Sequence, residues 1–225
     1  FGQKPRDPRN EKITQFHMDI ASSIQCITEE IMIKLSRSIS KEYKIKNLCL
    51  AGGVALNCVA NGKILKEKIF DKIWIQPAAG DAGGSLGAAL AFWYIEQNKN
   101  RKINPNDDMQ GSYLGPEYSQ SNIEKSLKEA NAVFEILNDE EILEKTSESL
   151  QNGNAIGWFQ GRMEFGPRAL GARSILGDPR SPEMQKNLNL KVKFRESFRP
   201  FAPSIIFADI SEWFELNEKS PYILL

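Results

Sequence analysis

Histidine is almost absent from this sequence, and cysteine is scarce. The single histidine, His17, has no second imidazole with which to share a metal ion, so a structural role is favoured. Cys26, Cys49 and Cys58 form neither a close-spaced pair nor an even-numbered framework, which excludes a disulfide scaffold. Cysteines in apolar segments usually behave as small buried hydrophobes, and we expect a reducing, cytoplasmic compartment.

Long apolar runs and an excess of charge of either sign are also missing. No stretch approaches the roughly eighteen apolar residues of a membrane span, and the first residues lack the hydrophobic core of a signal peptide. The 29 basic and 29 acidic side chains cancel, which argues against a nucleic-acid partner. The chain begins at Phe1 rather than at methionine, and we expect a piece of a longer protein. The sequence leaves a homodimer open.

Apolar periodicity in the first hundred residues predicts an α/β arrangement. Apolar side chains recur every three or four residues from Phe16 to Leu35, which predicts a helix with one apolar stripe. Two strand-turn-helix repeats follow. Their strands are expected at residues 47–51 and 72–76, and their helices at 54–69 and 85–97.

A polar segment at residues 98–110, rich in Asn, Asp and Pro, predicts a domain boundary. We therefore expect one domain over residues 1–105 and a second over residues 106–225. In the second, the pattern predicts helices at 121–130 and 139–151, a short strand-like segment at 132–137, a strand at 155–159 and a buried strand at 205–207.

The most unusual stretch is GRMEFGPRALGARSILGDPR, residues 161–180. Six of the ten arginines, but only three of the nineteen lysines, fall within residues 161–199. Arginine's planar fork suits bidentate recognition of phosphate, and the interleaved glycines let the backbone turn or approach a ligand closely. A structural ion-pair network around Glu164, Asp178 and Glu196 is the alternative that spacing leaves open. The later segment at 191–204 mixes cations and aromatics, which suits either single-stranded nucleic acid or a packed turn.

Two glycine turns lead from a strand into a helix. Gly52-Gly53 follows the first strand and Gly80-Asp81 follows the second, and such turns leave free N–H groups where phosphate binds readily. The Asp81 carboxylate could hold a metal or a ribose hydroxyl, or it could cap the next helix.

Four motifs, in this order, resemble the O-carbamoyltransferases of the nodulation-factor and antibiotic-tailoring type. They are AGGVALNCVANGKI at 51–64, QPAAGDAGGSLGAAL at 76–90, the arginine stretch at 161–180 and KFRESFRPFAPS at 193–204. The resemblance covers nearly the whole chain, although members of that family are more than twice as long.

The resemblance implies a fold and a reaction. Residues 1–105 would be the second lobe of an actin-like (RNase H-like) ATPase domain, and residues 106–225 the start of a YrdC-like mixed α/β domain. Such enzymes convert carbamoyl phosphate and ATP to carbamoyl-adenylate, and then pass the carbamoyl group to a hydroxyl of a small sugar or antibiotic-like acceptor. Alternatives are a tRNA-modifying relative and a non-catalytic nucleotide- or RNA-binding module.

The resemblance also implies roles for individual residues. Asp81, in the GDxGxxxGAA loop, would be a catalytic residue and a ligand of a divalent metal, iron or magnesium. The two histidines that complete that site in the family are absent here, so this chain alone is expected to be inactive. Arg168 and Arg173 would also be catalytic. The implied nucleotide-binding residues are Gly52, Gly53, Asn57 and Gly80, and the implied phosphate-binding residues are Arg162, Arg168, Arg173, Lys193 and Arg199. For Asn57 a hydrogen bond within its own helix turn is the alternative.

Overall fold

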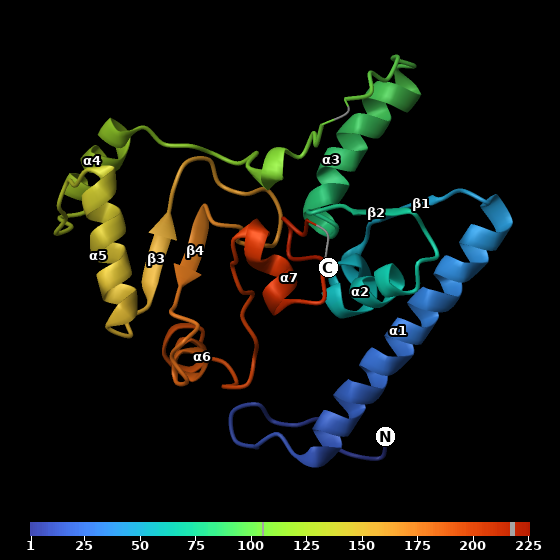
Figure 1. The fold of residues 1–225 in the computed structure, drawn as a ribbon, viewed down its shortest axis with the longest axis horizontal. Helices are drawn as coiled ribbons and strands as arrows, with labels where there is room; N and C mark the ends of the chain where they lie inside the picture. The colour runs from blue at the N-terminus through green and yellow to red at the C-terminus, as the bar shows by residue number, and fades with distance from the viewer. Residues whose placement is uncertain (105, 217–218) are drawn as a thin grey trace. The chain divides into compact units, whose positions relative to one another are not determined.

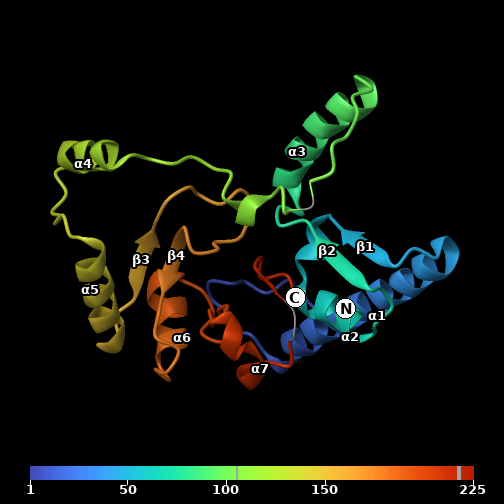
Figure 2. The ribbon, with the colours of Figure 1, turned by 45° about the horizontal axis from the view of Figure 1, so that its top comes forward.

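The computed structural model describes residues 1–104, 106–216 and 219–225, and these form two compact units. The first unit contains residues 1–76 with 224–225, and the second contains residues 77–223. Each has its own pair of strands (Figures 1 and 2). The predicted α/β class is confirmed in this general sense. The units divide at Gln76, and the assignment of domains 1–105 and 106–225 stays a prediction.

The first unit is a strand-helix-strand arrangement beside one long helix. Its elements are helix α1 (Gln15–Tyr43), strand β1 (Asn47–Leu50), the 3-10 helix η1 (Gly53–Leu56), helix α2 (Cys58–Lys66) and strand β2 (Lys72–Ile75). β1 and β2 pair in parallel, with Asn47 opposite Lys72, and α2 lies between them in the chain. Parallel strands need such a crossover, so the predicted repeat is confirmed in its first half.

The core of the first unit forms where α1, α2 and the strands meet. Leu48, Ile64 and Phe70 are buried together, and Met32 and Ile33 of α1 pack against them. The predicted stripe of α1 lies elsewhere on the helix: Ile24 and Leu35 are each 56 % exposed. The helix itself is confirmed and extends to Tyr43.

The second unit contains the remaining elements. They are helix α3 (Asp81–Ala91), the π-helical turn η2 (Phe92–Glu96), the 3-10 turn η3 (Gln110–Ser112), helices α4 (Gln120–Glu129) and α5 (Asp139–Gln151), strands β3 (Ile156–Phe159) and β4 (Arg173–Leu176), helix α6 (Met184–Asn187), the π-helical turn η4 (Leu188–Val192), the 3-10 turn η5 (Phe207–Asp209) and helix α7 (Ile210–Trp213). The side chain of Asn138 caps α5 by accepting the Glu141 N–H, and the Glu141 carboxylate accepts the Asn138 N–H in return.

β3 and β4 form an antiparallel pair that determines where the arginine stretch lies. Ile156 pairs with Leu176 and Phe159 with Arg173, so the two strands run side by side (Figure 1). The connection between them is the segment from Gln160 to Ala172, and the Gln160 N–H donates to the Ala172 carbonyl at 2.9 Å. Most of the arginine motif is therefore a long hairpin loop on a two-stranded base.

Four local predictions are wrong. Residues 132–137 form no strand, and residues 205–207 run from irregular backbone into η5, with Ile206 72 % exposed. The helix predicted at 54–69 is divided, because η1 ends at Leu56 and α2 begins only at Cys58. Cys26 and Cys49 are exposed rather than buried, although all three cysteines are free as expected.

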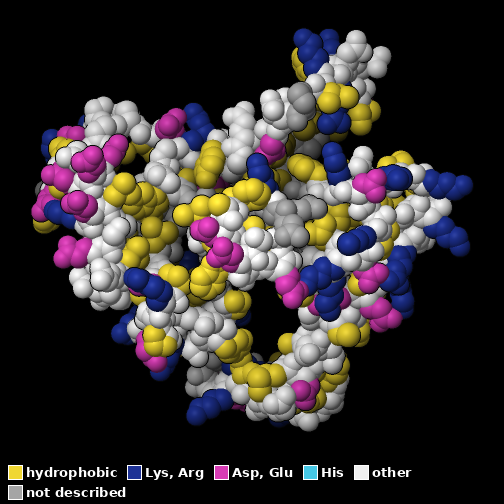
Figure 3. All heavy atoms as spheres, viewed as in Figure 1, with side chains coloured by type: hydrophobic (Ala, Val, Ile, Leu, Met, Phe, Trp, Pro, Cys, Tyr) yellow, Lys and Arg dark blue, Asp and Glu magenta, His cyan; other side chains and the backbone are white. Residues whose placement is uncertain are grey.

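The surface carries charged side chains of both signs (Figure 3). Basic and acidic side chains are interspersed over the face seen in Figure 3. Within the described residues, no helix is both long enough and apolar enough to cross a membrane.

Candidate functional site

The arginine loop, which we define as residues 161–173, depends on glycine for its course. Gly161, Gly166 and Gly171 have φ angles of +58°, +124° and +110°, a range that side chains with a Cβ rarely adopt. Gly166 has a second constraint, because a Cβ there would lie 3.3 Å from the Cα and Cβ of Ala78. The interleaved glycines therefore serve both backbone turning and close approach.

A buried carboxylate organises the loop from inside. Glu164 is 4 % exposed, and its Oε1 accepts the N–H groups of Leu170 at 2.6 Å and Ala172 at 2.8 Å. Its Oε2 accepts Nε–H of Arg173 at 3.0 Å. Arg173 in turn donates from Nη2 to the Gly166 carbonyl at 3.1 Å, which closes the loop on itself. Oriented N–H groups and a cation of this kind form an anion-binding concavity, which here is occupied by the chain's own carboxylate.

The electrostatics of Glu164 follow from these contacts. Burial by itself would raise the pKa of Glu164, but the N–H groups of Leu170 and Ala172 and the Arg173 guanidinium together outweigh it, so the pKa lies below its ordinary value. Glu164 is therefore ionised at neutral pH, and its charge is balanced by Arg173.

A second segment, residues 109–117, holds the loop from outside. The backbones of Gly115 and Met163 join through a 2.8 Å hydrogen bond, and the Phe165 N–H donates to the Ser112 carbonyl at 2.6 Å. The Tyr113 hydroxyl donates to the Leu170 carbonyl at 2.7 Å. Sequence reasoning missed this partner, because its few apolar residues directly follow the polar stretch at 98–110.

The predicted phosphate-binding residues fall into two groups. Arg162, Arg168 and Arg173 lie on the arginine loop, where Arg168 is partly buried. Lys193 and Arg199 lie on a second loop, residues 193–201, and both are exposed. The structure thus brings the first three together on one loop and places the other two on a separate one.

Several of these cations already have acidic partners. Arg162 contacts the Glu117 carboxylate at 3.2 Å and also donates to the Gly115 carbonyl at 2.8 Å. Arg199 contacts Glu196 at 3.1 Å. Together with the Glu164 pair, these contacts form much of the ion-pair network that the sequence offered as an alternative.

Asp178 and Arg180, just beyond the loop, complete that network. Arg180 contacts the Asp178 carboxylate through both Nε and Nη2, and these hydrogen bonds lower the Asp178 pKa to about 2. This pair is a local one between residues two positions apart, and neither residue belongs to the predicted site.

The second basic loop is organised by a buried amide that the sequence did not reveal. Asn189 is fully buried, and its Nδ2 donates to the carbonyls of Ser197 at 3.1 Å and Arg199 at 2.8 Å. Its Oδ1 accepts Nε–H of Arg195 at 2.7 Å. The Arg195 guanidinium lies 5.0 Å from the centre of the Phe201 ring, so one Arg and one aromatic of this loop stack on each other.

The predicted nucleotide-binding residues Gly52, Gly53 and Asn57 belong to the first unit. Gly52 has a φ of +95°, and Gly53 begins η1. The Asn57 Oδ1 accepts the Ala60 N–H at 3.1 Å and so caps α2, while its Nδ2 donates to Gln25 of α1 at 2.9 Å. The hydrogen bond within the helix turn, which was the alternative for Asn57, is therefore present, and Gln25 is a partner that sequence reasoning missed.

Gly80 and Asp81 belong to the second unit. Asp81 is the first residue of α3, where its exposed carboxylate faces the positive end of the helix dipole, and Gly80 precedes it without a side chain to cap the helix. Among the described residues, no group of three or more His, Cys, Asp or Glu side chains could hold a metal ion. The residues present therefore do not make a metal centre around Asp81.

The loop before α3 packs against the arginine loop within the second unit. Ala78 and Ala79 are buried, and Gly166 approaches Ala78 as described above. Gly83, in the first turn of α3, faces Ala78 so closely that a Cβ there would lie 2.0 Å from the Ala78 oxygen. Small residues in this loop permit close approach, and the arginine loop is the neighbour that approaches at Gly166.

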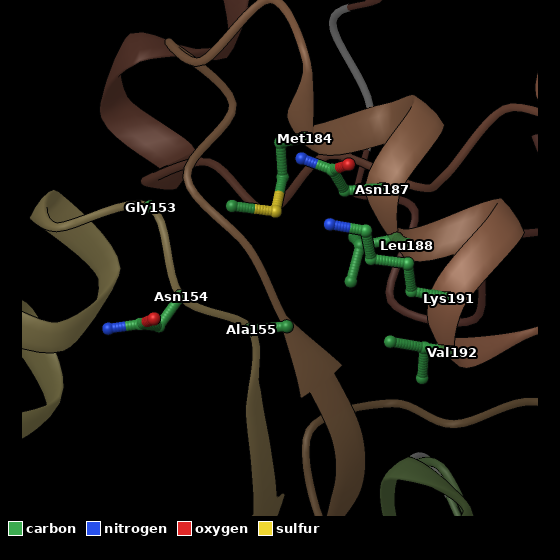
Figure 4. A pocket seen from close by; sticks show the side chains of 8 residues that line it. All are labelled: Gly153, Asn154, Ala155, Met184, Asn187, Leu188, Lys191 and Val192. Atoms are coloured by element: carbon green, nitrogen blue, oxygen red, sulfur yellow. The ribbon is translucent and has the colours of Figure 1, made fainter.

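A shallow hollow of about 160 Å³ lies elsewhere in the second unit. Figure 4 shows it between the segment that follows α5 and the α6–η4 turn. None of the predicted site residues lines it; the lining residues are Gly153, Asn154, Ala155, Met184, Asn187, Leu188, Lys191 and Val192.

Two family models match separate parts of this chain. The model for the carbamoyltransferase N-terminus matches residues 3–90, which include the Asp81 loop, and the model for the carbamoyltransferase C-terminus matches residues 147–225, which include the arginine loop. The chain belongs to the carbamoyltransferase family. The resemblance of the four motifs is thereby confirmed.

Relatives within the family agree with this assignment. The chain is 52 % identical over 227 residues to an uncharacterized protein of Synechocystis sp., with 100 % of the chain and 37 % of that protein covered. It is 44 % identical over 206 residues to the nodulation protein NolO of Bradyrhizobium diazoefficiens, with 91 % and 37 % covered. Identity to the nodulation protein U of Sinorhizobium fredii is 29 % over 209 residues, with 92 % and 35 % covered. The chain thus spans little more than a third of the length of these relatives.

Proposed function

We propose that the longer protein to which this chain corresponds is an ATP-dependent carbamoyltransferase. It converts carbamoyl phosphate, water and ATP to carbamoyl-adenylate, with release of inorganic phosphate and pyrophosphate. A hydroxyl of a small sugar or antibiotic-like acceptor then takes the carbamoyl group, and AMP is released. The family match over both halves of the chain supports the carbamoyl chemistry. The donor, ATP and the acceptor class follow from the four-motif resemblance.

The observation that carries the proposal is the construction of the arginine loop. Arg168 and Arg173 lie on a loop whose backbone is fixed by hydrogen bonds to the buried Glu164. The Arg173 guanidinium is also held by Glu164 and need not be ordered again when a phosphate arrives. Formation of an adenylate requires two anionic substrates to be gathered and oriented, which is mainly a matter of positioning and electrostatics. A charge-assisted hydrogen bond to phosphate contributes about 1.5–3 kcal/mol.

We assign the residues of this chain as follows. Arg168 and Arg173, with Arg162, bind the phosphate of the donor, and Lys193 and Arg199 contribute from the second basic loop. In the first unit, Gly52 and Gly53 present backbone N–H groups to the nucleotide. Asn57 already bonds Ala60 and Gln25, and we assign the second N–H of its Nδ2 to the nucleotide.

Asp81 and Gly80 belong to the transfer site in this proposal. A divalent ion, iron or magnesium, would need further ligands from parts of the longer protein outside this chain, because the described residues form no group of three or more His, Cys, Asp or Glu side chains that could hold it. The finer fold assignments remain part of the proposal: an actin-like second lobe over residues 1–105 and the start of a YrdC-like domain over residues 106–225.

The ion pairs favour a small anion over RNA as the ligand. Arg162, Arg173 and Arg199 each contact a carboxylate, so much of the positive charge in this region is neutralised locally. An RNA-binding face would instead leave several cations to contact successive phosphates, and its affinity would fall steeply with salt.

Pyrophosphate release by the full-length protein tests the proposal. We expect release only when ATP and carbamoyl phosphate are both present, and AMP formation only when a hydroxylated acceptor is added as well. ATP turnover that ignores carbamoyl phosphate would contradict the proposed donor. A titration with single-stranded RNA at two salt concentrations provides the comparison with the RNA-binding alternative.

A further inference from the structure

The Glu164 carboxylate occupies the place where the arginine loop could itself hold an anion. It accepts two backbone N–H groups from the far side of the loop, those of Leu170 and Ala172, and one N–H from Arg173. Its side chain is fully buried, so no external ligand reaches it. The residues that bind Glu164 lie six to nine positions further along the chain, and one carboxylate therefore fixes the whole return of the loop.

Arg173 is held so that only part of its fork is engaged. Nε contacts Glu164 and Nη2 contacts the Gly166 carbonyl, while 34 % of the side chain remains exposed. The exposed part is fixed in direction, because two bonds from one planar group to two different partners define its plane. Arg168 lies on the segment between Gly166 and Leu170, and both ends of that segment are tied to this same network.

We propose that Glu164 is the positioning residue for phosphate recognition: through Arg173 and the loop backbone it aims Arg173 and Arg168 at the phosphate of carbamoyl phosphate without touching that substrate. This inference rests on the proposed function for the identity of the phosphate donor. It assigns a role to Glu164, which the motif resemblance does not. It also assigns a role in substrate binding to the Glu164–Arg173 ion pair, which would otherwise be a purely structural contact.

Glu164→Gln in the full-length protein is the primary test. The amide keeps the shape and one acceptor oxygen, but it removes the charge that orients the Arg173 guanidinium. We expect KM for carbamoyl phosphate to rise by about ten-fold or more, as for the loss of one charge-assisted contact, while KM for ATP changes much less. Asp178→Asn is the matched control, because it removes an acidic partner of arginine outside the loop, and its KM values should stay as in the wild type.

A double-mutant cycle separates positioning from a general effect on stability. If Glu164 acts through Arg173, Glu164→Gln combined with Arg173→Lys should raise KM little more than Arg173→Lys alone. If the two substitutions instead raise KM independently, so that their fold-increases multiply in the double variant, the proposal is overturned. So would a Glu164→Gln protein with a lower melting temperature but unchanged KM for carbamoyl phosphate, since that is the signature of a structural contact only.

Tyr113→Phe serves if Glu164→Gln fails to fold. It removes the hydroxyl that ties the loop at Leu170 from the outside and leaves the buried charges intact. A rise in KM for carbamoyl phosphate of about two-fold or more, with KM for ATP unchanged, would support a positioning role for the loop's anchors, as expected for the loss of one neutral hydrogen bond. Wild-type KM values in Tyr113→Phe would count against it.

Inorganic phosphate distinguishes failure of this inference from failure of the proposed function. Phosphate that binds the folded protein raises its melting temperature by mass action, with no catalysis required. We expect that increase in the wild type and in Asp178→Asn, and a reduced one in Glu164→Gln. If pyrophosphate release is absent but this pattern holds, the proposed reaction is wrong and the positioning role stands. An equal increase in all three proteins would refute the positioning role alone.

Discussion

Replacement of Gly83 by alanine should destabilise the chain, although the same change in an ordinary helix stabilises it. Gly83 lies in the first turn of α3, and an added Cβ would lie 2.0 Å from the oxygen and 3.1 Å from the carbonyl carbon of Ala78. Both are backbone atoms, so relief requires the 77–80 segment to move. At Gly87, in the same helix, an added Cβ would meet nothing within 4 Å, so this position provides the matched control.

The expected magnitudes follow from two opposing effects. Overpacking costs about 1–3 kcal/mol, and a 2.0 Å contact with backbone belongs at the upper end of that range. Alanine gains about 1 kcal/mol over glycine in a helix. We therefore expect Gly83→Ala to lose about 2 kcal/mol and Gly87→Ala to gain up to about 1 kcal/mol. For a chain of this length each 1 kcal/mol shifts Tm by about 2–4 °C, so the two variants should melt roughly 6–12 °C apart.

Thermal unfolding of the 225-residue chain, followed by far-ultraviolet circular dichroism, measures this difference. The melting temperature should be highest in Gly87→Ala, intermediate in the wild type and lowest in Gly83→Ala. Coincident melting of the two variants would show that α3 does not pack on Ala78 as described. The close contact between Gly83 and Ala78 would then have to be abandoned.

Three further outcomes are expected. Gly166→Ala combines a φ of +124° with the close approach to Ala78 and should lose about 1–3 kcal/mol in urea unfolding, whereas Gly157→Ala, with nothing within 4 Å, should be nearly neutral; equal midpoints would contradict the loop geometry. Asp81→Ala in the full-length protein should abolish transfer to the acceptor but preserve carbamoyl phosphate-dependent pyrophosphate release, and equal loss of both would reject separate sites. The Glu164 pKa is lowered in the folded state, so the ionised carboxylate stabilises the fold fully above the ordinary pKa of 4.5, and this stabilisation is lost as pH falls through the lower, folded pKa. The difference in unfolding free energy between wild type and Glu164→Gln should therefore shrink over that pH range. A constant difference would show that Glu164 is not ionised in the fold.

Local periodicity was sufficient to predict most helices and the first strand pair. α1, α4 and α5 have regular apolar spacing, and the first turns of α4 and α5 are polar. β1 and β2 are short apolar runs, each followed within a few residues by a turn that contains glycine. Glycine also indicated the loops correctly, because positive φ at Gly52, Gly166 and Gly171 is a local requirement. These features depend on residues close together in the chain, which is why a single sequence reveals them.

The missed features depend on long-range contacts. β4 begins at Arg173 inside an arginine- and glycine-rich stretch, and only its pairing with β3 makes it a strand. The 109–117 segment carries no regular pattern, yet it holds the arginine loop through Ser112 and Tyr113. The apolar run at 205–207 was predicted to be buried from hydropathy alone, but no strand pairs with it among the described residues.

The candidate site shows the same division. The sequence indicated which arginines gather on one loop, because they are neighbours in the chain. It left open whether Glu164, Asp178 and Glu196 pair with them, since that depends on the direction of each side chain. The structure shows that each of these carboxylates contacts an arginine, so the question is now which cations also bind substrate.

The most direct test of phosphate recognition by the arginine loop is the KM for carbamoyl phosphate of the full-length Arg168→Lys protein, measured by pyrophosphate release beside Arg180→Lys. Both changes keep the charge and remove the planar fork, but only Arg168 lies on the arginine loop. If that loop binds the phosphate donor, KM should rise by about ten-fold or more in Arg168→Lys and stay at the wild-type value in Arg180→Lys, with both proteins melting close to the wild type. Equal KM values in all three proteins would contradict this role, because the Arg168 fork would then make no contact with the phosphate donor.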